Sequence, residues 1–148
     1  MNDVSQIFVL LLAFEVKQLL CDYPILPDFL LKRFHSNGIK AFILYSAFHA
    51  FITFTICLLL TNAEYPLALL MSLLDFAAGF GLAMFRSHSS MIARFKPLDL
   101  DEFMSASRKQ KRHHRMYWTF FGLDQALHHM THFSIIYILC LQGVVWMM

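Results

Sequence analysis

The chain has 148 residues and a formal net charge of +2; 58% of its residues are hydrophobic and only 15% are charged. Soluble domains carry more charge and less apolar surface, so this composition excludes an ordinary soluble domain and indicates a membrane protein. The cysteines Cys21, Cys57 and Cys140 all lie in apolar runs, which predicts buried thiols and no disulfide framework.

Four apolar stretches, taken in chain order, predict an all-α, polytopic transmembrane bundle of about four helices. They cover residues 5–21, 39–60, 66–85 and 116–148 of a single transmembrane domain, residues 1–148. A helix needs about 20 residues to cross the hydrocarbon core, and helices satisfy their own backbone groups there. The N-terminus lacks the positive charge and the cleavage site of a secretory signal, so the first helix is expected to stay in the mature protein.

Two short connections predict how these helices are joined. Residues 61–65, followed by Pro66 at a helix start, form a tight link, so the second and third stretches are expected to form an antiparallel hairpin. Residues 22–38 contain two prolines and an amphipathic piece that is expected to lie in the membrane interface. A short similarity between the sequences around His49 and His128 is compatible with two tandem hairpins.

The third connection, residues 86–115, is the only long polar segment of the sequence. Asp99 and Glu102 match a helix N-cap and its third residue, which predicts an interfacial or cytoplasmic helix over 100–115 that continues into the fourth stretch. The basic cluster at 108–115 is expected to anchor the topology and to contact anionic lipid. Nucleic acid is not expected as a partner, because the cluster contains no aromatic stacking residues.

The basic residues are distributed very unevenly along the chain. All of the 12 Lys and Arg residues except Lys17 lie in or at the edges of connections 22–38 and 86–115. With four spans these two connections share one side of the membrane, and the positive-inside rule places that side in the cytoplasm. Both termini are therefore expected on the non-cytoplasmic side.

Ionisable and amide side chains also lie within the apolar stretches, where a charged group costs about 2.5–3.5 kcal/mol and usually faces the bundle interior. They come from all four stretches: Glu15, Gln18 and Asp22; His49; Asp75; and Asp124, Gln125, His128, His129 and His132. Helical spacing places the members of each stretch on shared or neighbouring faces. Their depths predict one polar centre in the cytoplasmic half of the bundle.

Three interpretations of this polar centre remain open. Its histidines and carboxylates are the side chains that hold a divalent metal such as zinc in a bundle core. They are also the groups that relay protons through membrane proteins. Alternatively, they form hydrogen bonds between helices, worth about 0.6 kcal/mol each on average, and fix the bundle without any chemistry.

The segments 91–98 and 122–133 resemble domain-of-unknown-function family 3307, whose members are small bacterial and phage membrane proteins, and the phage branch in particular. Asp124-Gln125-x-x-His128 matches the most specific motif of that family, and His49 matches the single histidine of its second helix. The resemblance covers nearly the whole chain and implies a bacterial inner membrane location. It also implies metal ligands at Asp22, His49, Asp124 and His128, as in membrane-bound metal-dependent hydrolases.

The chain departs from the family pattern at two His-x-x-x-Asp pairs. The first pair is replaced by Gln18 and Asp22, and the second by Gly79 and Ala83, so about three metal ligands are missing. The four groups that remain are enough for one zinc ion. The leading hypothesis is a non-catalytic or degenerate member that binds a protein partner, forms a homo-oligomer or modifies the membrane. The alternatives are a single-metal hydrolase and a proton or ion pathway.

Overall fold

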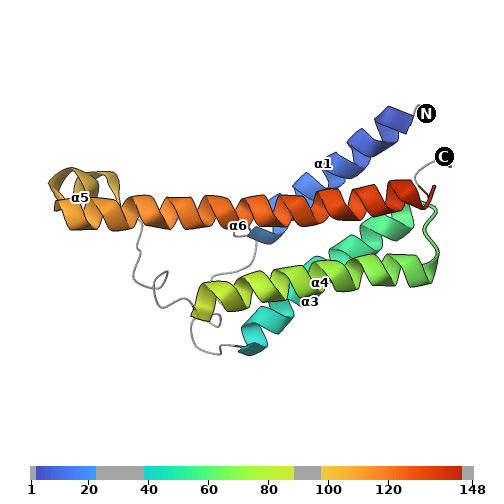
Figure 1. Ribbon diagram of the computed structural model, residues 1–148, viewed down its shortest axis with the longest axis horizontal. Coiled ribbons are helices and arrows are strands. Elements are labelled where there is room, and N and C mark those ends of the chain that lie inside the picture. The colour runs from blue at the N-terminus through green and yellow to red at the C-terminus, as the bar shows by residue number, and fades with distance from the viewer. Residues whose placement is uncertain (1–2, 23–38, 89–97, 145–148) are drawn as a thin grey trace.

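The computed structural model describes residues 3–22, 39–88 and 98–144, and every regular element within them is a helix (Figure 1). The helices in chain order are α1 (Asp3–Asp22), α3 (Ile39–Leu60), α4 (Tyr65–His88), α5 (Leu100–Ser105) and α6 (Arg108–Leu141). The predicted all-α class is therefore confirmed for these residues. The connection 22–38 and its expected interfacial piece lie outside the described residues, apart from the backbone of Asp22 at the end of α1.

Three of these helices are long and apolar enough to cross a membrane, judged by length and composition. The apolar segments are Val4–Cys21 in α1, Phe42–Leu60 in α3 and Tyr65–Phe85 in α4, which agree with the first three predicted stretches within a few residues. The fourth predicted stretch corresponds to α6, which is 34 residues long but is not one of the three. Its histidines, Asp124 and Gln125 lower its hydropathy, so a fourth crossing stays a prediction.

Helices α3 and α4 lie along one another and are joined by residues 61–64 alone. The hydroxyl of Thr61 closes this link, because it donates to the Cys57 carbonyl and accepts from the Ala63 N–H at 3.2 Å. The backbone N–H of Asn62 donates to the Val144 carbonyl at 2.9 Å, which brings the end of α6 to the same place. The link, the start of α1 and the end of α6 lie at one end of the bundle (Figure 1).

The predicted continuous helix over 100–115 is wrong, because α5 ends at Ser105 and a new helix begins at Arg108. Ser107 between them has an extended backbone, with φ −62° and ψ 160°. Its hydroxyl accepts from the Gln110 N–H at 3.4 Å, and the Gln110 side chain accepts from the Ser107 N–H at 2.9 Å. This reciprocal capping box stabilises a helix start at a residue that interrupts the preceding helix.

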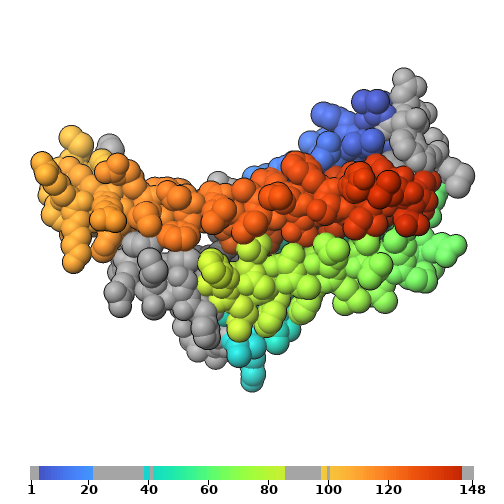
Figure 2. Space-filling model, in the orientation of Figure 1, coloured from blue at the N-terminus to red at the C-terminus, as the bar shows by residue number. Residues whose placement is uncertain are grey.

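Helix α5 begins at the predicted cap and folds back on the first turns of α6. The Asp99 N–H donates to the Glu102 carboxylate at 3.3 Å, as the sequence pattern predicts. The ring centroid of Phe103 lies 5.0 Å from that of His114 and 5.3 Å from the Lys111 Nζ atom. Helix α5 thus covers one side of α6 at the end that projects beyond the other helices (Figures 1 and 2).

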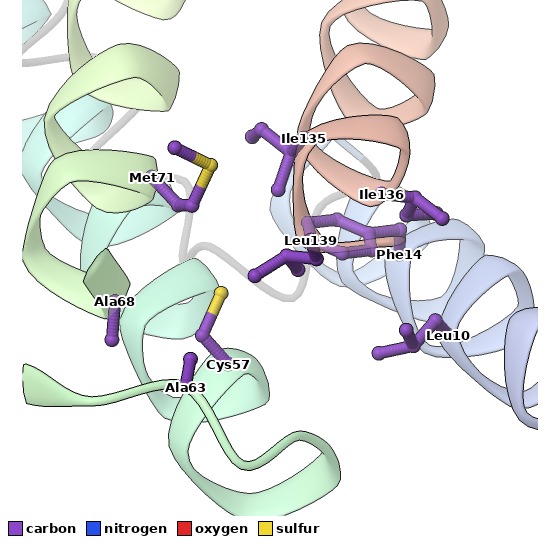
Figure 3. Packing of buried hydrophobic residues seen from close by; sticks show 9 residues of the cluster. All are labelled: Leu10, Phe14, Cys57, Ala63, Ala68, Met71, Ile135, Ile136 and Leu139. Carbon is purple, nitrogen blue, oxygen red and sulfur yellow. The ribbon is translucent and has the colours of Figure 1, made fainter. Parts of the chain in front are cut away.

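The apolar core lies between α1, α3, α4 and α6, in the half of the bundle nearest the 61–64 link. Figure 3 shows its buried side chains, which are Leu10, Phe14, Cys57, Ala63, Ala68, Met71, Ile135, Ile136 and Leu139. Cys21 and Cys57 are buried free thiols, as predicted, whereas Cys140 is only half-buried. Most of the buried polar groups lie around the middle of the bundle and beyond it, whereas Gln6, Thr61 and Ser72 are buried on the same side as this core.

Candidate functional site: a buried polar centre

The centre of the site is the ammonium group of Lys17, which α1 carries into the middle of the bundle. Its Nζ atom lies 2.5 Å from Asp75 Oδ2 of α4, 2.8 Å from Thr53 Oγ1 of α3 and 3.1 Å from His132 Nε2 of α6. Each of the other three long helices therefore contributes one acceptor. An ammonium group has three N–H donors and no acceptor, so these contacts use its full hydrogen-bonding capacity. We call Lys17, Thr53, Asp75 and His132 the Lys17 cluster.

The protonation of the Lys17 cluster follows from its geometry. Because a charged Lys17 can only donate, His132 Nε2 must accept, which assigns the ring proton to Nδ1. The Thr53 hydroxyl accepts from Lys17 and donates to Asp75 Oδ2 at 2.8 Å, which closes a ring of three groups. With His132 neutral, the charges of Lys17 and Asp75 cancel. Paired charges of this kind are the form in which ionisable residues tolerate a membrane interior.

The polar faces of α1 and α6 meet along an antiparallel seam. The Gln18 side-chain Nε2 donates to the Gln125 side-chain Oε1 at 3.2 Å, and Glu15 Oε1 lies 3.0 Å from His129 Nδ1. The Glu15 side chain is 51% exposed, so this second pair lies at the rim of the bundle. The seam joins polar residues of the first and fourth predicted stretches, with Glu15 and His129 at the rim and Gln18 and Gln125 further inside.

A pair of histidines lies one helical turn from the Lys17 cluster, on the side away from the apolar core. The rings of His49 and His128 stack with their centroids 5.6 Å apart and an interplanar angle of 24°. Both residues are at most 1% exposed. Gly79 of α4 faces this pair, since a Cβ atom at Gly79 would lie 3.9 Å from His128 Cε1 and 3.6 Å from Ser46 Oγ. The His49–His128 pair therefore has a third helix beside it.

The structure brings together two of the four predicted metal ligands, His49 and His128. Asp124 is half-buried and lines an apolar cavity of about 90 Å³ beside Tyr117 and Phe121. The side chain of Asp22 lies outside the described residues. Within the described part of the chain, no group of three or more His, Cys, Asp or Glu side chains is placed to hold a metal ion. A zinc site has three or four protein ligands, so the predicted site stays a prediction.

Asp75 and His132 belong to the predicted polar centre, but Lys17 and Thr53 do not. Lys17 does carry a signal, because it is the one basic residue outside the two connections and it lies in an apolar helix. A lysine in such a helix usually faces the bundle interior and pairs with another ionisable residue or with backbone carbonyls. Thr53 carries no signal, since the sequence places it in an apolar stretch beside several similar residues.

No family model matches the chain, and no curated protein or solved structure matches it. Membership of domain-of-unknown-function family 3307 therefore stays a prediction. The class that the fold and site define is a helical protein with three apolar helices long enough to cross a membrane and a buried ion pair between them.

Proposed function

We propose that this protein is a non-catalytic membrane protein whose polar centre fastens its helices and whose surface binds a partner within the bilayer. The observation that carries this proposal is the engagement of all three Lys17 donors by acceptors from three other helices. A catalytic group needs hydrogen-bonding capacity for its substrate, whereas Lys17 uses its capacity inside the bundle. The Lys17 cluster therefore has a structural role, which is to hold the four long helices together.

The apolar core supports the same proposal. Met71, Ile135 and Leu139 are each at most 1% exposed and lie between the Lys17 cluster and the 61–64 link. A conducting path requires polar or hydrated groups along the whole membrane thickness. Among the described residues on that side, the buried polar side chains are Gln6, Thr61 and Ser72, and the two hydroxyls donate to backbone carbonyls of α3 and α4. Apolar side chains therefore interrupt the polar groups between the Lys17 cluster and the 61–64 link.

The surface that we propose for partner binding is an open groove of about 530 Å³ between α4 and α6. Small side chains line much of it, namely Ala77, Ala78, Gly81, Thr131 and Ser134. The hydroxyls of Thr131 and Ser134 donate to carbonyls of α6 itself, at 3.0 and 2.8 Å, so they are satisfied in an apolar surrounding. Small residues let helix backbones approach closely, and such packing drives association in lipid. A transmembrane helix of another protein is the occupant that fits.

Filling the groove tests this proposal. Gly81→Leu places a large side chain in it, because nothing lies within 4 Å of a Cβ at Gly81. Gly122→Leu is the matched control, since Gly122 is equally open and does not line the groove. A photo-crosslinking residue replacing Ala77 is expected to capture a discrete membrane protein. We expect Gly81→Leu to abolish this crosslink and Gly122→Leu to leave it unchanged. Recovery of the chain alone in all three cases would overturn partner binding.

A second candidate function, proton transfer, is favoured by the position of His132. Its Nε2 atom lies 3.1 Å from Lys17 Nζ and 3.8 Å from Asp75 Oδ1, so three ionisable groups from three helices are within reach of one proton. Proton flux into liposomes tests this function. Flux that exceeds that of empty liposomes and disappears in Asp75→Asn would support it, and flux equal to that of empty liposomes would remove it.

The alternative of a single-metal hydrolase is favoured by the His49–His128 pair, which supplies two imidazoles from two helices. The metal content of the protein purified in detergent tests it. Stoichiometric zinc that is lost in both His49→Ala and His128→Ala would support a metal centre and contradict a purely structural role of the polar centre. A well-folded protein without metal would remove the hydrolase.

A further inference from the structure

The first turns of α6 carry a stripe of four basic side chains, Arg108, Lys111, Arg112 and Arg115. Their spacing of i, i+3, i+4 and i+7 places them on one face of the helix. The three arginines are exposed, and Lys111 is half-buried against Phe103. Among the residues that the structure describes, no carboxylate lies in ion-pair contact with any of the four. The stripe is therefore a concentrated positive charge without a protein counter-ion in this part of the chain.

The position of the stripe along α6 places it at a membrane surface when α6 crosses the bilayer. The helix has 34 residues and is about 51 Å long, whereas the hydrocarbon core is about 30 Å thick. If α6 leaves the core at Leu141, about 20 residues bring the other boundary close to Phe121. Tyr117 and Trp118 then lie at the interface, where aromatic residues gather. Arg115 and Arg112 start about 9 and 14 Å beyond the core boundary, so their long side chains point charge toward the headgroup layer, whereas Arg108 lies about 20 Å beyond that boundary.

The structure also keeps this end of α6 straight and oriented. The capping box at Ser107 begins the helix one residue before Arg108, so the stripe has a helical backbone from its first member. Phe103 of α5 packs against His114 and Lys111 and covers one neighbouring side of α6. A guanidinium group offers a planar fork of donors that matches phosphate oxygens. Arg112 and Arg115, the two guanidinium groups nearest the membrane, therefore present two such forks on one face of the helix.

We propose that the membrane-proximal end of this stripe, Arg112 and Arg115, binds the phosphates of anionic phospholipid headgroups and so holds α6 at a fixed depth in the membrane. The inference is independent of partner binding in the α4–α6 groove, because the two surfaces share no residue. It depends on α6 crossing the membrane. The stripe is expected to prefer anionic lipid to zwitterionic lipid, because the phosphate of a zwitterionic lipid is neutralised within the same headgroup.

Trp118 is a built-in reporter for this proposal. It is 51% exposed and lies three residues after Arg115, next to the stripe. The full chain with Trp146→Phe has Trp118 as its single tryptophan. This protein is reconstituted in phosphatidylcholine vesicles that contain equal fractions of brominated phosphatidylglycerol or brominated phosphatidylcholine. We expect the anionic lipid to quench Trp118 several-fold more strongly, and Arg112→Gln or Arg115→Gln to reduce the preference by up to about fivefold each.

A matched pair of variants separates the stripe from net charge. Arg112→Gln with Arg115→Gln removes two charges on the stripe, and Lys40→Gln with Lys109→Gln removes two charges away from it. We expect only the first pair to lower the preference for anionic lipid, and circular dichroism checks that both pairs remain helical. Equal quenching by the two lipids in the parent protein, or equal losses in the two pairs, would overturn the proposal.

Free phosphate is the other source of the same chemistry. Vesicles are measured in sodium phosphate and in sodium chloride at equal ionic strength, because salt alone screens charges at a membrane surface. Equal quenching in the two salts supports recognition of the lipid headgroup. A preference that phosphate removes and chloride leaves intact would show a site for the free ion and overturn lipid binding.

Discussion

Lys17 and Asp75 are 58 positions apart in the sequence and form an ion pair of 2.5 Å where the four long helices meet. Both side chains are at most 1% exposed, so solvent does not replace a lost partner. Removing one member of a buried pair leaves an uncompensated charge, whereas replacing both members with apolar residues is often nearly neutral. The two residues are therefore expected to behave as one unit in mutational experiments.

Lys17→Met is expected to lower the free energy of unfolding by about 3 kcal/mol, because Asp75 is left buried and unpaired. Adding Asp75→Leu is expected to recover most of that loss. Denaturant unfolding in detergent, followed by circular dichroism, measures both effects, and Lys40→Met at an exposed position is the control. If the losses in free energy of unfolding simply add in the double variant, Lys17 and Asp75 do not act as one stabilising unit.

Thr53→Val is expected to cost about 1 kcal/mol, because its hydroxyl links Lys17 to Asp75. Thr55→Val is the matched control on the same helix, since the Thr55 hydroxyl donates to the Phe51 carbonyl at 2.9 Å, within α3. The same unfolding measurement compares the two variants. A similar cost for both would mean that the Thr53 hydroxyl contributes no more than an ordinary helix-bound hydroxyl.

Gly79→His is expected to bind zinc more tightly than the wild-type chain does. The new imidazole enters beside His128 and His49 and supplies a third nitrogen ligand. Competition with a chromophoric chelator is expected to show zinc affinity at least roughly tenfold above wild type, equivalent to about 1.4 kcal/mol. Gly81→His faces open space and should leave the affinity unchanged. Equal affinities in the two variants would mean that position 79 does not complete the pair.

Ser107→Ala is expected to loosen the start of α6 at a cost of about 1 kcal/mol, because the capping box is lost. Hydrogen exchange should become faster at residues 108–111 and stay unchanged near Leu139. In the control Ser105→Ala, the lost hydroxyl bonds only to the Asp101 and Glu102 carbonyls, so the exchange at 108–111 should not change. Unchanged exchange in Ser107→Ala would show that α5 packing alone holds this end.

The predicted four crossings would place Asn62 and Ser107 on opposite sides of the membrane. In a chain whose native cysteines are replaced by alanine, Asn62→Cys is expected to react with a membrane-impermeant maleimide in intact cells. Ser107→Cys should react only after the cells are opened. Both positions are exposed in the structure. Labelling of both, or of neither, in intact cells would contradict the orientation that the basic residues predict.

Hydropathy predicts α1, α3 and α4 closely, because the length of an apolar run is a local property; the second stretch agrees with Ile39–Leu60 at both ends. The break before α6 was also present in the sequence. Ser107 and Gln110 form a second capping signature eight residues after that of Asp99 and Glu102, and two helix starts so close together exclude one continuous helix.

Contacts between helices could be predicted only in part. Spacing groups Glu15 with Gln18 on α1 and Gln125 with His129 on α6, and the structure pairs Gln18 with Gln125 and Glu15 with His129. Which carboxylate pairs with Lys17 does not follow, because face and depth leave more than one candidate until the helices are packed. Likewise, His49 and His128 were expected in one centre, but their stacking depends on the bulk of neighbouring side chains.

The Lys17–Asp75 pair also has a consequence for the order in which α1 and α4 insert into the membrane during synthesis. A ribosome adding about 5–20 residues each second completes Asp75 roughly 3–12 s after Lys17, given their separation of 58 positions. During that interval α1 carries an uncompensated charge and is a poor membrane segment. We therefore expect α1 to settle in the bilayer only after α4 has emerged, with nascent chains that stop before Asp75 remaining sensitive to quality-control proteases.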